Sequence, residues 1–288
     1  MLYLVLLLCL YYLANYTDSP SHDMYKMEPG NLNLAIQWYQ TGNPLRNQEL
    51  ADSICANLKL EHFKSIHFLQ RENITLDELI TQINCTDISI EEVRGKTNLF
   101  QLDRKSIQVL KFNSAAADFY LDYNQNTETL SFEEAFDFAN RHLQNQLVVL
   151  ANLDISFDET LKELAEMTYF PPRFSLFLSR YERPVNEAIG IGTQCGPKYI
   201  GSHDAFVFRS PLPQQLVDGC RGLPLGISGT ENVAMWNFRN CGYQVENPCD
   251  RIKTWHNHRS GQRTPHSYKL NNPIRSAVCY PPSFIEHG

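Results

Sequence analysis

The chain has 288 residues, of which 43% are hydrophobic and 20% charged, and this composition is typical of a globular protein rather than a disordered one. Its formal net charge of −7 argues against a protein that binds nucleic acid, because a phosphate backbone requires a basic surface. The charge is compatible with a nucleotide ligand, because a bound divalent cation neutralises a diphosphate locally.

The amino terminus has the character of a targeting segment. Residues 1–14 are almost wholly apolar, and this run is closer to a signal-peptide core than to a membrane span of roughly 20 residues. We therefore divide the chain into a signal peptide or short signal anchor (1–17), a linker (18–30) and one domain (31–288). This division predicts the lumen of the Golgi or endoplasmic reticulum, with membrane anchoring through residues 1–14, or secretion if the leader is cleaved.

Glycosylation sequons and cysteines agree with the secretory pathway. Sequons begin at Asn15, Asn73 and Asn84. None of the eight cysteines forms a C-x-x-C pair, so a structural zinc site has no support, whereas disulfides are permitted. Five cysteines lie between residues 195 and 279 and indicate disulfides in the carboxyl-terminal half. Their pairing stays open. Seven cysteines lie beyond the leader, and this odd number leaves at least one of them free or unaccounted for.

Strands and helices are predicted to alternate through the first half of the domain. The expected elements are, in chain order, a strand at 32–40, a helix at 46–58, a strand at 65–69, a helix at 75–83, a strand at 106–112, a helix opened by the capping box of Ser131 and Glu134, a strand at 147–151 and a helix at 159–167. Such alternation with short connections predicts a parallel sheet flanked by helices.

The second half is less regular. We expect strands at 174–181, 205–209, 243–246 and 251–255, and a helix at 231–240 that Gly242 ends. A long loop over residues 182–201 contains three glycines and is interpreted either as a mobile cover of a site or as a plain surface insertion. The sequence shows no internal repeat.

The run at 147–151 is five consecutive apolar residues and predicts a central strand that is buried on both faces. The sequence then turns polar at Asn152, Asp154 and Asp158. In open α/β sheets ligands bind beyond the carboxyl ends of strands, and carboxylate oxygens suit Mg²⁺ or Mn²⁺ bound to substrate phosphates. The alternative is that Asp158 caps the next helix and Asp154 lies in a polar turn.

Two later groups could also take part in chemistry. Glu231 begins a helix after a glycine-rich turn, where it could deprotonate an attacking hydroxyl or merely complement the helix dipole. His256 and His258 lie two residues apart on an extended segment, so they could share a metal or phosphate, or be exposed loop residues. A serine-hydrolase elbow is absent, because the sequence contains no G-x-S-x-G. A nuclease is rejected, because the His-Asn-His residues are adjacent and the chain is acidic.

In their order, these groups resemble the motifs of nucleotide-sugar-dependent glycosyltransferases of the GT-A fold. Asn152-Leu153-Asp154 is similar to the Asp-x-Asp motif at the end of a central strand, with Asn in place of the first acid. Glu231-Asn232 is similar to the Glu-Asp motif that opens the acceptor-side helix of inverting members. The terminal His-x-His is similar to the late histidine that completes metal coordination, with His258 as the better match.

The resemblance implies a single α/β GT-A-like domain, with a mostly parallel twisted central sheet flanked by helices. It implies a metal-dependent, inverting glycosyltransferase that uses Mn²⁺ or Mg²⁺, a nucleotide-sugar donor and a glycan, glycoprotein or glycolipid acceptor. The implied roles are metal binding by Asp154, Asp158 and His258, donor binding by Asn152, Asp154 and Arg180, catalysis by Glu231, and substrate binding by Asp204, Asn232, His256 and Trp236.

Two other functions stay open at this point. The asparagines at positions 152 and 232 are compatible with a catalytically inactive GT-A-like module that binds a sugar or a protein. A metal-dependent hydrolase of phosphate esters is the third candidate.

Overall fold

The computed structural model describes residues 28–71, 74–102, 129–182, 203–227 and 229–257, and the backbone of two short paired strands, β4 (Phe112–Ser114) and β5 (Ala117–Phe119). The predicted leader, the sequons at Asn15 and Asn73, the loop at 183–202 and His258 lie outside the described residues. Most of the strand expected at 106–112 lies outside them as well.

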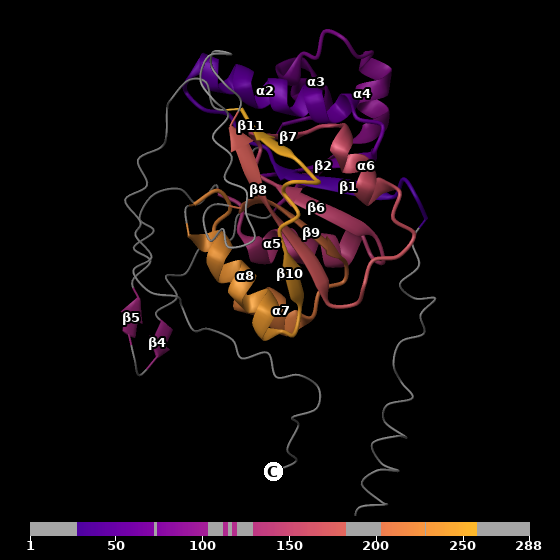
Figure 1. Ribbon diagram of the computed structural model, residues 1–288. Coiled ribbons are helices and arrows are strands. Elements are labelled where there is room, and N and C mark those ends of the chain that lie inside the picture. The colour runs from indigo at the N-terminus through magenta and orange to yellow at the C-terminus, as the bar shows by residue number, and fades with distance from the viewer. Residues whose placement is uncertain are drawn as a thin grey trace, which may run out of the picture.

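A nine-stranded sheet forms the centre of the domain (Figure 1). Its order is β3-β2-β1-β6-β9-β8-β11-β7, and β10 pairs with β8 beside this path. The strands are β1 (Leu32–Gln37), β2 (Phe63–Gln70), β3 (Thr97–Gln101), β6 (Leu147–Ala151), β7 (Ile155–Phe157), β8 (Phe174–Glu182), β9 (His203–Arg209), β10 (Gln244–Glu246) and β11 (Thr254–His256). Within this sheet β9 and β7 run antiparallel to their neighbours. The predicted α/β class with a mostly parallel sheet is confirmed.

The order of the strands contains a topological switch point. The chain passes outward from β1 to β2 and β3, and then returns to β6 on the other side of β1. Beyond the carboxyl ends of β1 and β6 the connections therefore diverge to opposite sides. In open α/β sheets this is the place where a crevice for a ligand forms.

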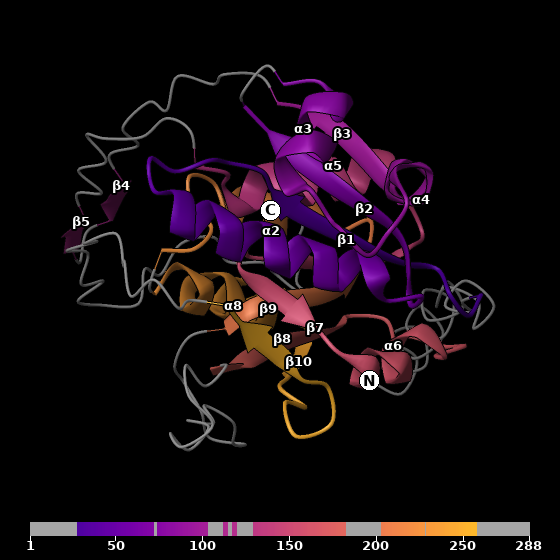
Figure 2. The same ribbon diagram turned by 90° about the horizontal axis from the view of Figure 1, so that it is seen from above.

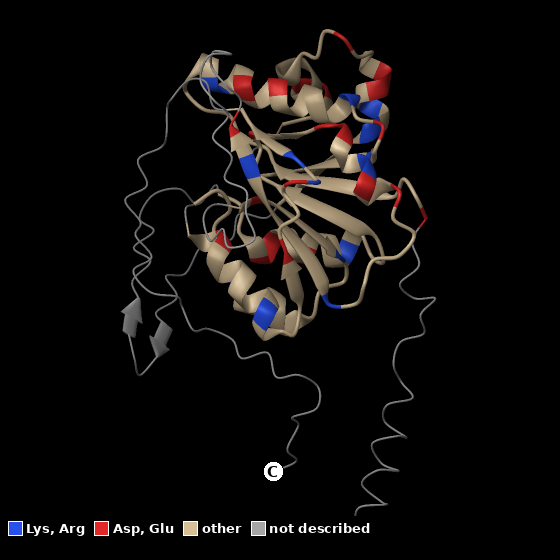
Figure 3. Ribbon diagram, in the orientation of Figure 1, with Lys and Arg blue, Asp and Glu red and all other residues tan. Residues whose placement is uncertain are grey.

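Helices cover both faces of the sheet. The helices are α2 (Pro44–Lys59), α3 (Leu76–Ile83), α4 (Ile90–Lys96), α5 (Phe132–His142), α6 (Lys162–Ala165), α7 (Gln214–Gly219) and α8 (Thr230–Asn240). One core cluster joins α2, α3, α4 and α6 to one face, and a second joins α5, α7 and α8 to the other. Successive side chains of β6 alternate between them: Val149 belongs to the first cluster, and Val148 and Leu150 to the second. This strand is buried on both faces, as predicted. Figure 3 shows the charged residues mainly on the helices and loops.

Local signals explain where several helices begin. The predicted capping box is present. The Ser131 hydroxyl accepts a hydrogen bond from the backbone amide of Glu134, and the Glu134 carboxylate accepts one from the backbone amide of Ser131. Asn43 caps α2, with Pro44 at the first helical position. Among the described residues, no helix is long and apolar enough to cross a membrane.

The sequence-based element predictions need three corrections. The third strand of the large sheet is β3, and it follows a short helix, α4, that was not predicted. The helix expected at 159–167 is a 3₁₀ turn (Glu159–Leu161) followed by the single turn of α6. A short strand, β7, follows Asp154 and was not predicted, whereas Asp154 itself lies in a turn, which was the alternative interpretation. These elements are three to seven residues long, so they carry too few residues for a hydrophobic period to be visible.

Disulfides link parts of the domain, as the cysteine content predicted. Cys55 on α2 is bonded to Cys85, just after α3. Cys241 and Cys249 are disulfide-bonded as well, in the half where bridges were expected. Cys220 is free and buried, and burial raises the pKa of its thiol to about 12.

Strand β7 depends on an amide side chain from α2, which runs alongside it (Figure 2). The strand lies at the end of the sheet and pairs with β11 on one side. On its other side the Asn57 amide donates to the Ile155 carbonyl and its oxygen accepts from the Phe157 amide, both at 2.9 Å. Asn57 therefore takes the place of a missing neighbouring strand.

Replacing Asn57 by Leu is expected to lower the free energy of unfolding by roughly 3 kcal/mol, because two buried backbone groups of β7 lose their partners. Chemical denaturation measures the change. The matched control is Gln48→Leu on the exposed face of the same helix, which should stay within about 0.5 kcal/mol of the wild type. Equal effects of the two substitutions would contradict this role of Asn57.

Candidate functional site

The residues predicted to form the site gather around the carboxyl end of β6. Asn152 follows the strand directly, and its backbone amide donates to the Asp204 backbone carbonyl at 3.0 Å. The Ile155 amide then bonds to the Asn152 carbonyl at 3.1 Å, so the chain turns before β7 and places Asp154 in the turn. The Asp154 carbonyl accepts from the Asn257 amide at 2.9 Å, which fixes the end of β11 beside this turn.

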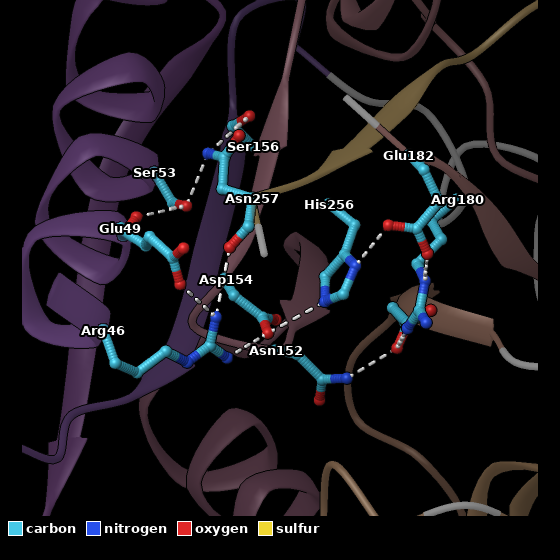
Figure 4. A network of polar contacts seen from close by, with 11 residues as sticks. Arg46, Glu49, Ser53, Asn152, Asp154, Ser156, Arg180, Glu182, His256 and Asn257 are labelled. Carbon is cyan, nitrogen blue, oxygen red and sulfur yellow. Dashed lines mark hydrogen bonds and ion pairs between the residues drawn. The ribbon is translucent and has the colours of Figure 1, made fainter. Parts of the chain in front are cut away.

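The Asp154 carboxylate is paired with two cationic groups (Figure 4). Arg46, in the first turn of α2, donates from Nη2 to Asp154 Oδ2 at 2.5 Å. His256 Nε2 lies 3.1 Å from the same oxygen, and His256 Nδ1 lies 2.8 Å from Glu182 Oε2. Three elements that are distant in sequence, α2, β11 and β8, thus meet at the turn after β6.

The contacts continue through Glu182 to a second arginine. Arg180 donates from Nε to Glu182 Oε1 at 3.0 Å and from Nη1 to Asp204 Oδ1 at 2.9 Å. The side-chain amide of Asn152 donates from Nδ2 to the same oxygen, Asp204 Oδ1, at 2.8 Å. The structure therefore connects five of the predicted residues in one polar network, namely Asn152, Asp154, Arg180, Asp204 and His256.

Burial and charge set the ionisation of this network. Burial alone would raise the pKa of Asp154, but the hydrogen bonds and charges of His256 and Arg46 outweigh it and hold the pKa below its usual range. The same balance, with His256 and Arg180 as partners, lowers the pKa of Glu182 to about 2. For Asp204 burial prevails over the charge of Arg180, and the pKa is raised.

Glu231 lies near this network, at the start of α8. The helix follows Gly229, whose φ of 95° is a left-handed conformation that favours glycine. The Glu231 side chain is buried, and burial raises the pKa of its carboxyl to about 7, with the charge of Asp204 acting in the same direction and its own backbone amide and Arg180 opposing. The turn before α8 passes close to Asn152, since a Cβ on Gly226 would lie 3.8 Å from Asn152 Oδ1.

Three predicted residues lie apart from the network. Asn232 is exposed and Trp236 is half-buried, and neither hydrogen-bonds to the network among the described residues. Asp158 caps the 3₁₀ turn through Thr160 and accepts from Trp255 Nε1 at 2.7 Å. It follows Asp154 by four residues along β7, a separation of about 13 Å in extended chain. Asp158 therefore matches the capping role that was the alternative interpretation.

The described residues do not fit a divalent ion as the site is arranged. Among them, no group of three or more His, Cys, Asp or Glu side chains is placed to hold a metal. Asp154 Oδ2 is bonded to Arg46 and His256, and both oxygens of Asp158 are bonded elsewhere. The predicted third ligand, His258, lies outside the described residues.

Sequence reasoning missed Arg46, Glu49 and Glu182. Arg46 does follow a recognisable signal, because Asn43-Pro44 opens a helix directly after the strand that precedes the switch point. Glu182 is the last residue of β8, and nothing in its neighbours indicates that it faces His256.

No family model and no curated protein matches the chain. Among solved structures, that of GalNAc-T7 with UDP, GalNAc and Mn²⁺ is similar, with a TM-score of 0.52, 10% identity, 81% of this chain covered and 44% of that chain. The mannosyltransferase PcManGT from Pyrobaculum calidifontis with GDP-Man and Mn²⁺ gives a TM-score of 0.42 and 10% identity over 87% of this chain and 64% of that one. The chain thus spans less than two thirds of either structure. The first similarity shows a shared GT-A-like fold, and at this identity it shows the fold alone.

The charge of His256 makes stability depend on pH. Burial would lower its pKa, but the hydrogen bonds to Asp154 and Glu182 raise it to about 9, above the ordinary value of 6.5. Between these values the folded protein binds more protons than the unfolded chain, so stability falls as pH rises. We expect the imidazolium to contribute up to about 3 kcal/mol below pH 6.5, and this contribution to be lost as pH rises through 9.

Denaturation of the wild type and of His256→Gln between pH 6 and pH 10 measures this contribution. The wild type should be more stable at the acidic end, and the two curves should approach each other at the alkaline end. A difference that does not change with pH would show that the histidine is not held protonated.

Proposed function

We propose that the chain is a glycosyltransferase that moves a sugar from a nucleotide-sugar donor to a hydroxyl acceptor. The observation that carries the proposal is Glu231, a buried carboxyl with a pKa near 7 beside the polar network at the carboxyl edge of the sheet. The GT-A-like fold supports it, because the site lies where ligands bind in open α/β sheets.

Glu231 has the properties of a general base. A base is most effective when its pKa lies near the working pH, and burial brings Glu231 to about 7. The first turn of a helix packed into the core holds the carboxyl rigidly. In the proposed reaction this carboxylate takes the proton of the acceptor hydroxyl as the oxygen attacks the anomeric carbon, and the bond from that carbon to the diphosphate oxygen breaks, so that the nucleoside diphosphate leaves with the electron pair. A single displacement of this kind inverts the anomeric centre.

The donor is proposed to lie over the switch point between β1 and β6. Two guanidinium groups, Arg46 and Arg180, border this position, and both are ion-paired with carboxylates of the chain. Guanidinium groups are the side chains that recognise phosphate oxygens most specifically. Asn152, between them, offers an amide oxygen facing the turn at Gly226. No step of the proposed reaction is assigned to a metal ion.

The secretory pathway is proposed as the location of the protein. The Cys55–Cys85 bridge and the disulfide-bonded Cys241 and Cys249 support it, because disulfides persist in oxidising compartments. Anchoring through residues 1–14, residence in the Golgi or endoplasmic reticulum, and a glycan, glycoprotein or glycolipid acceptor belong to the same proposal.

One observation favours a second function, a GT-A-like module that binds a sugar or a protein without turnover. Asp154, which the resemblance assigns to the donor's diphosphate, is engaged by two of the chain's own side chains. The two functions differ in the effect of Glu231, since a binding module needs no base.

Replacing Glu231 by Gln is expected to lower kcat about 10²-fold or more and to leave nucleotide binding unchanged, because the amide cannot accept the hydroxyl proton. A panel of nucleotide sugars with hydroxyl acceptors, followed by product mass, measures transfer, and calorimetry measures nucleotide binding. In the wild type, kcat should fall as pH drops below about 7, because the carboxylate becomes protonated.

The matched control is Glu246→Gln, an exposed glutamate on β10, which should keep wild-type activity. Nucleotide-sugar binding by the wild type without transfer to any acceptor would favour the binding module. Donor hydrolysis that is indifferent to Glu231→Gln would favour a hydrolase instead.

A further inference from the structure

The guanidinium of Arg46 lies in a cage of oxygen atoms (Figure 4). Its Nη2 donates to Asp154 Oδ2 at 2.5 Å, and its Nη1 donates to Glu49 Oε2 and to the Asn257 carbonyl, both at 3.1 Å. The cage combines two carboxylates and one carbonyl. Oxygen atoms of these kinds are the ligands that Mg²⁺ and Mn²⁺ take from proteins.

The cage is tightly built around this one cation. The side chains of Arg46, Asp154 and Glu49 are 12%, 13% and 8% exposed. Tyr39 is also hydrogen-bonded to Arg46, and burial with the charge of Asp154 raises the pKa of its phenol to about 12. A guanidinium has five N–H donors, so the contacts described here use most of them. Removing one partner of such a buried ion pair leaves an uncompensated charge.

A divalent ion and Arg46 cannot use these oxygens together. The guanidinium does not lose its proton at any physiological pH, so it stays a cation in the cage. A metal ion bound to Asp154 Oδ2 would lie against this cation and would have to displace it. Displacement would break the contact of Arg46 with Glu49 within α2 and its contact with the Asn257 carbonyl, which joins α2 to the end of β11.

We propose that Arg46 is the resident cation of this site, and that Asp154 binds no divalent ion. Asp154 is then the counter-ion that positions Arg46, and the guanidinium fills the place beside Asp154 Oδ2 that a metal ion would need. A second part of the proposal rests on the proposed function: a nucleoside diphosphate binds at this site without a metal ion.

Titration of the full chain with MnCl₂, with free Mn²⁺ followed by electron paramagnetic resonance, tests the proposal directly. We expect no Mn²⁺ binding to the wild type that depends on Asp154, up to about 1 mM. Mn²⁺ binding that Asp154→Asn weakens about tenfold or more would overturn the proposal. Binding that Asp154→Asn leaves unchanged lies elsewhere and agrees with it. Glu49→Gln tests the same cage from the other carboxylate if Asp154→Asn does not fold.

Arg46→Met should create a site where the wild type has none. The substitution removes the cation and leaves the two carboxylates and the carbonyl that surrounded it, so Mn²⁺ affinity should rise at least tenfold over the wild type. The double variant Arg46→Met, Asp154→Asn should lose this gain. Arg94→Met is the matched control, because it removes an exposed arginine that pairs with Asp77 and should gain no Mn²⁺. A folded Arg46→Met protein that gains nothing would contradict the cage.

Binding of UDP and GDP by calorimetry, with EDTA or with MnCl₂, separates this proposal from the proposed function. Equal nucleotide affinity in both solutions is expected. Affinity that requires Mn²⁺ and is lost in Asp154→Asn would overturn metal-independent recognition. If neither nucleotide binds in either solution, the proposed function fails, whereas the Mn²⁺ titrations still decide the role of Arg46.

Discussion

The ion pair between Arg46 and Asp154 is the contact on which the arrangement of the site depends. It joins the first turn of α2 to the turn after β6, across the switch point of the sheet. His256 extends it to β11, and Glu182 and Arg180 extend it to β8 and β9. Because charges at low exposure must be paired, each element can occupy its position only when its neighbours are in place. The contacts that set the geometry of the site are therefore also the contacts that hold these helices and strands together.

The sequence predicts the elements of this arrangement better than the contacts between them. The apolar run of β6, the capping box of α5 and the polar residues after β6 are visible because each is a local pattern. The partner of Asp154 is not local, since Arg46 lies 108 residues away in sequence. A carboxylate at the end of a central strand can face a metal, a solvent channel or an arginine, and its own neighbours do not distinguish these cases. Strand β7 escaped prediction because pairing with β11 and the Asn57 amide, rather than its own three residues, makes it a strand.

Glu231 and Asp154 show opposite solutions for a buried carboxyl. Asp154 receives two cationic partners, and its pKa is lowered although burial acts against this. Glu231 is buried and has no comparable partner among the residues that the structure describes, so burial prevails and its pKa rises to about 7. A carboxylate held in this way lowers stability at neutral pH, because the unfolded chain would ionise it freely. Neighbouring carboxyl groups with pKa values pushed apart are typical of sites that assign them different roles.

The contrast also separates structure from chemistry within the site. A group that positions others needs a fixed charge and hydrogen bonds that hold it in place, and Arg46, Asp154 and His256 have both. A group that exchanges a proton needs the reverse, a pKa near the working pH and an environment that can tolerate either charge. Of the acidic residues described at this edge of the sheet, Glu231 has that property. The network thus supports the edge against which a ligand can bind, and the reactive carboxyl stands beside it on a separate helix.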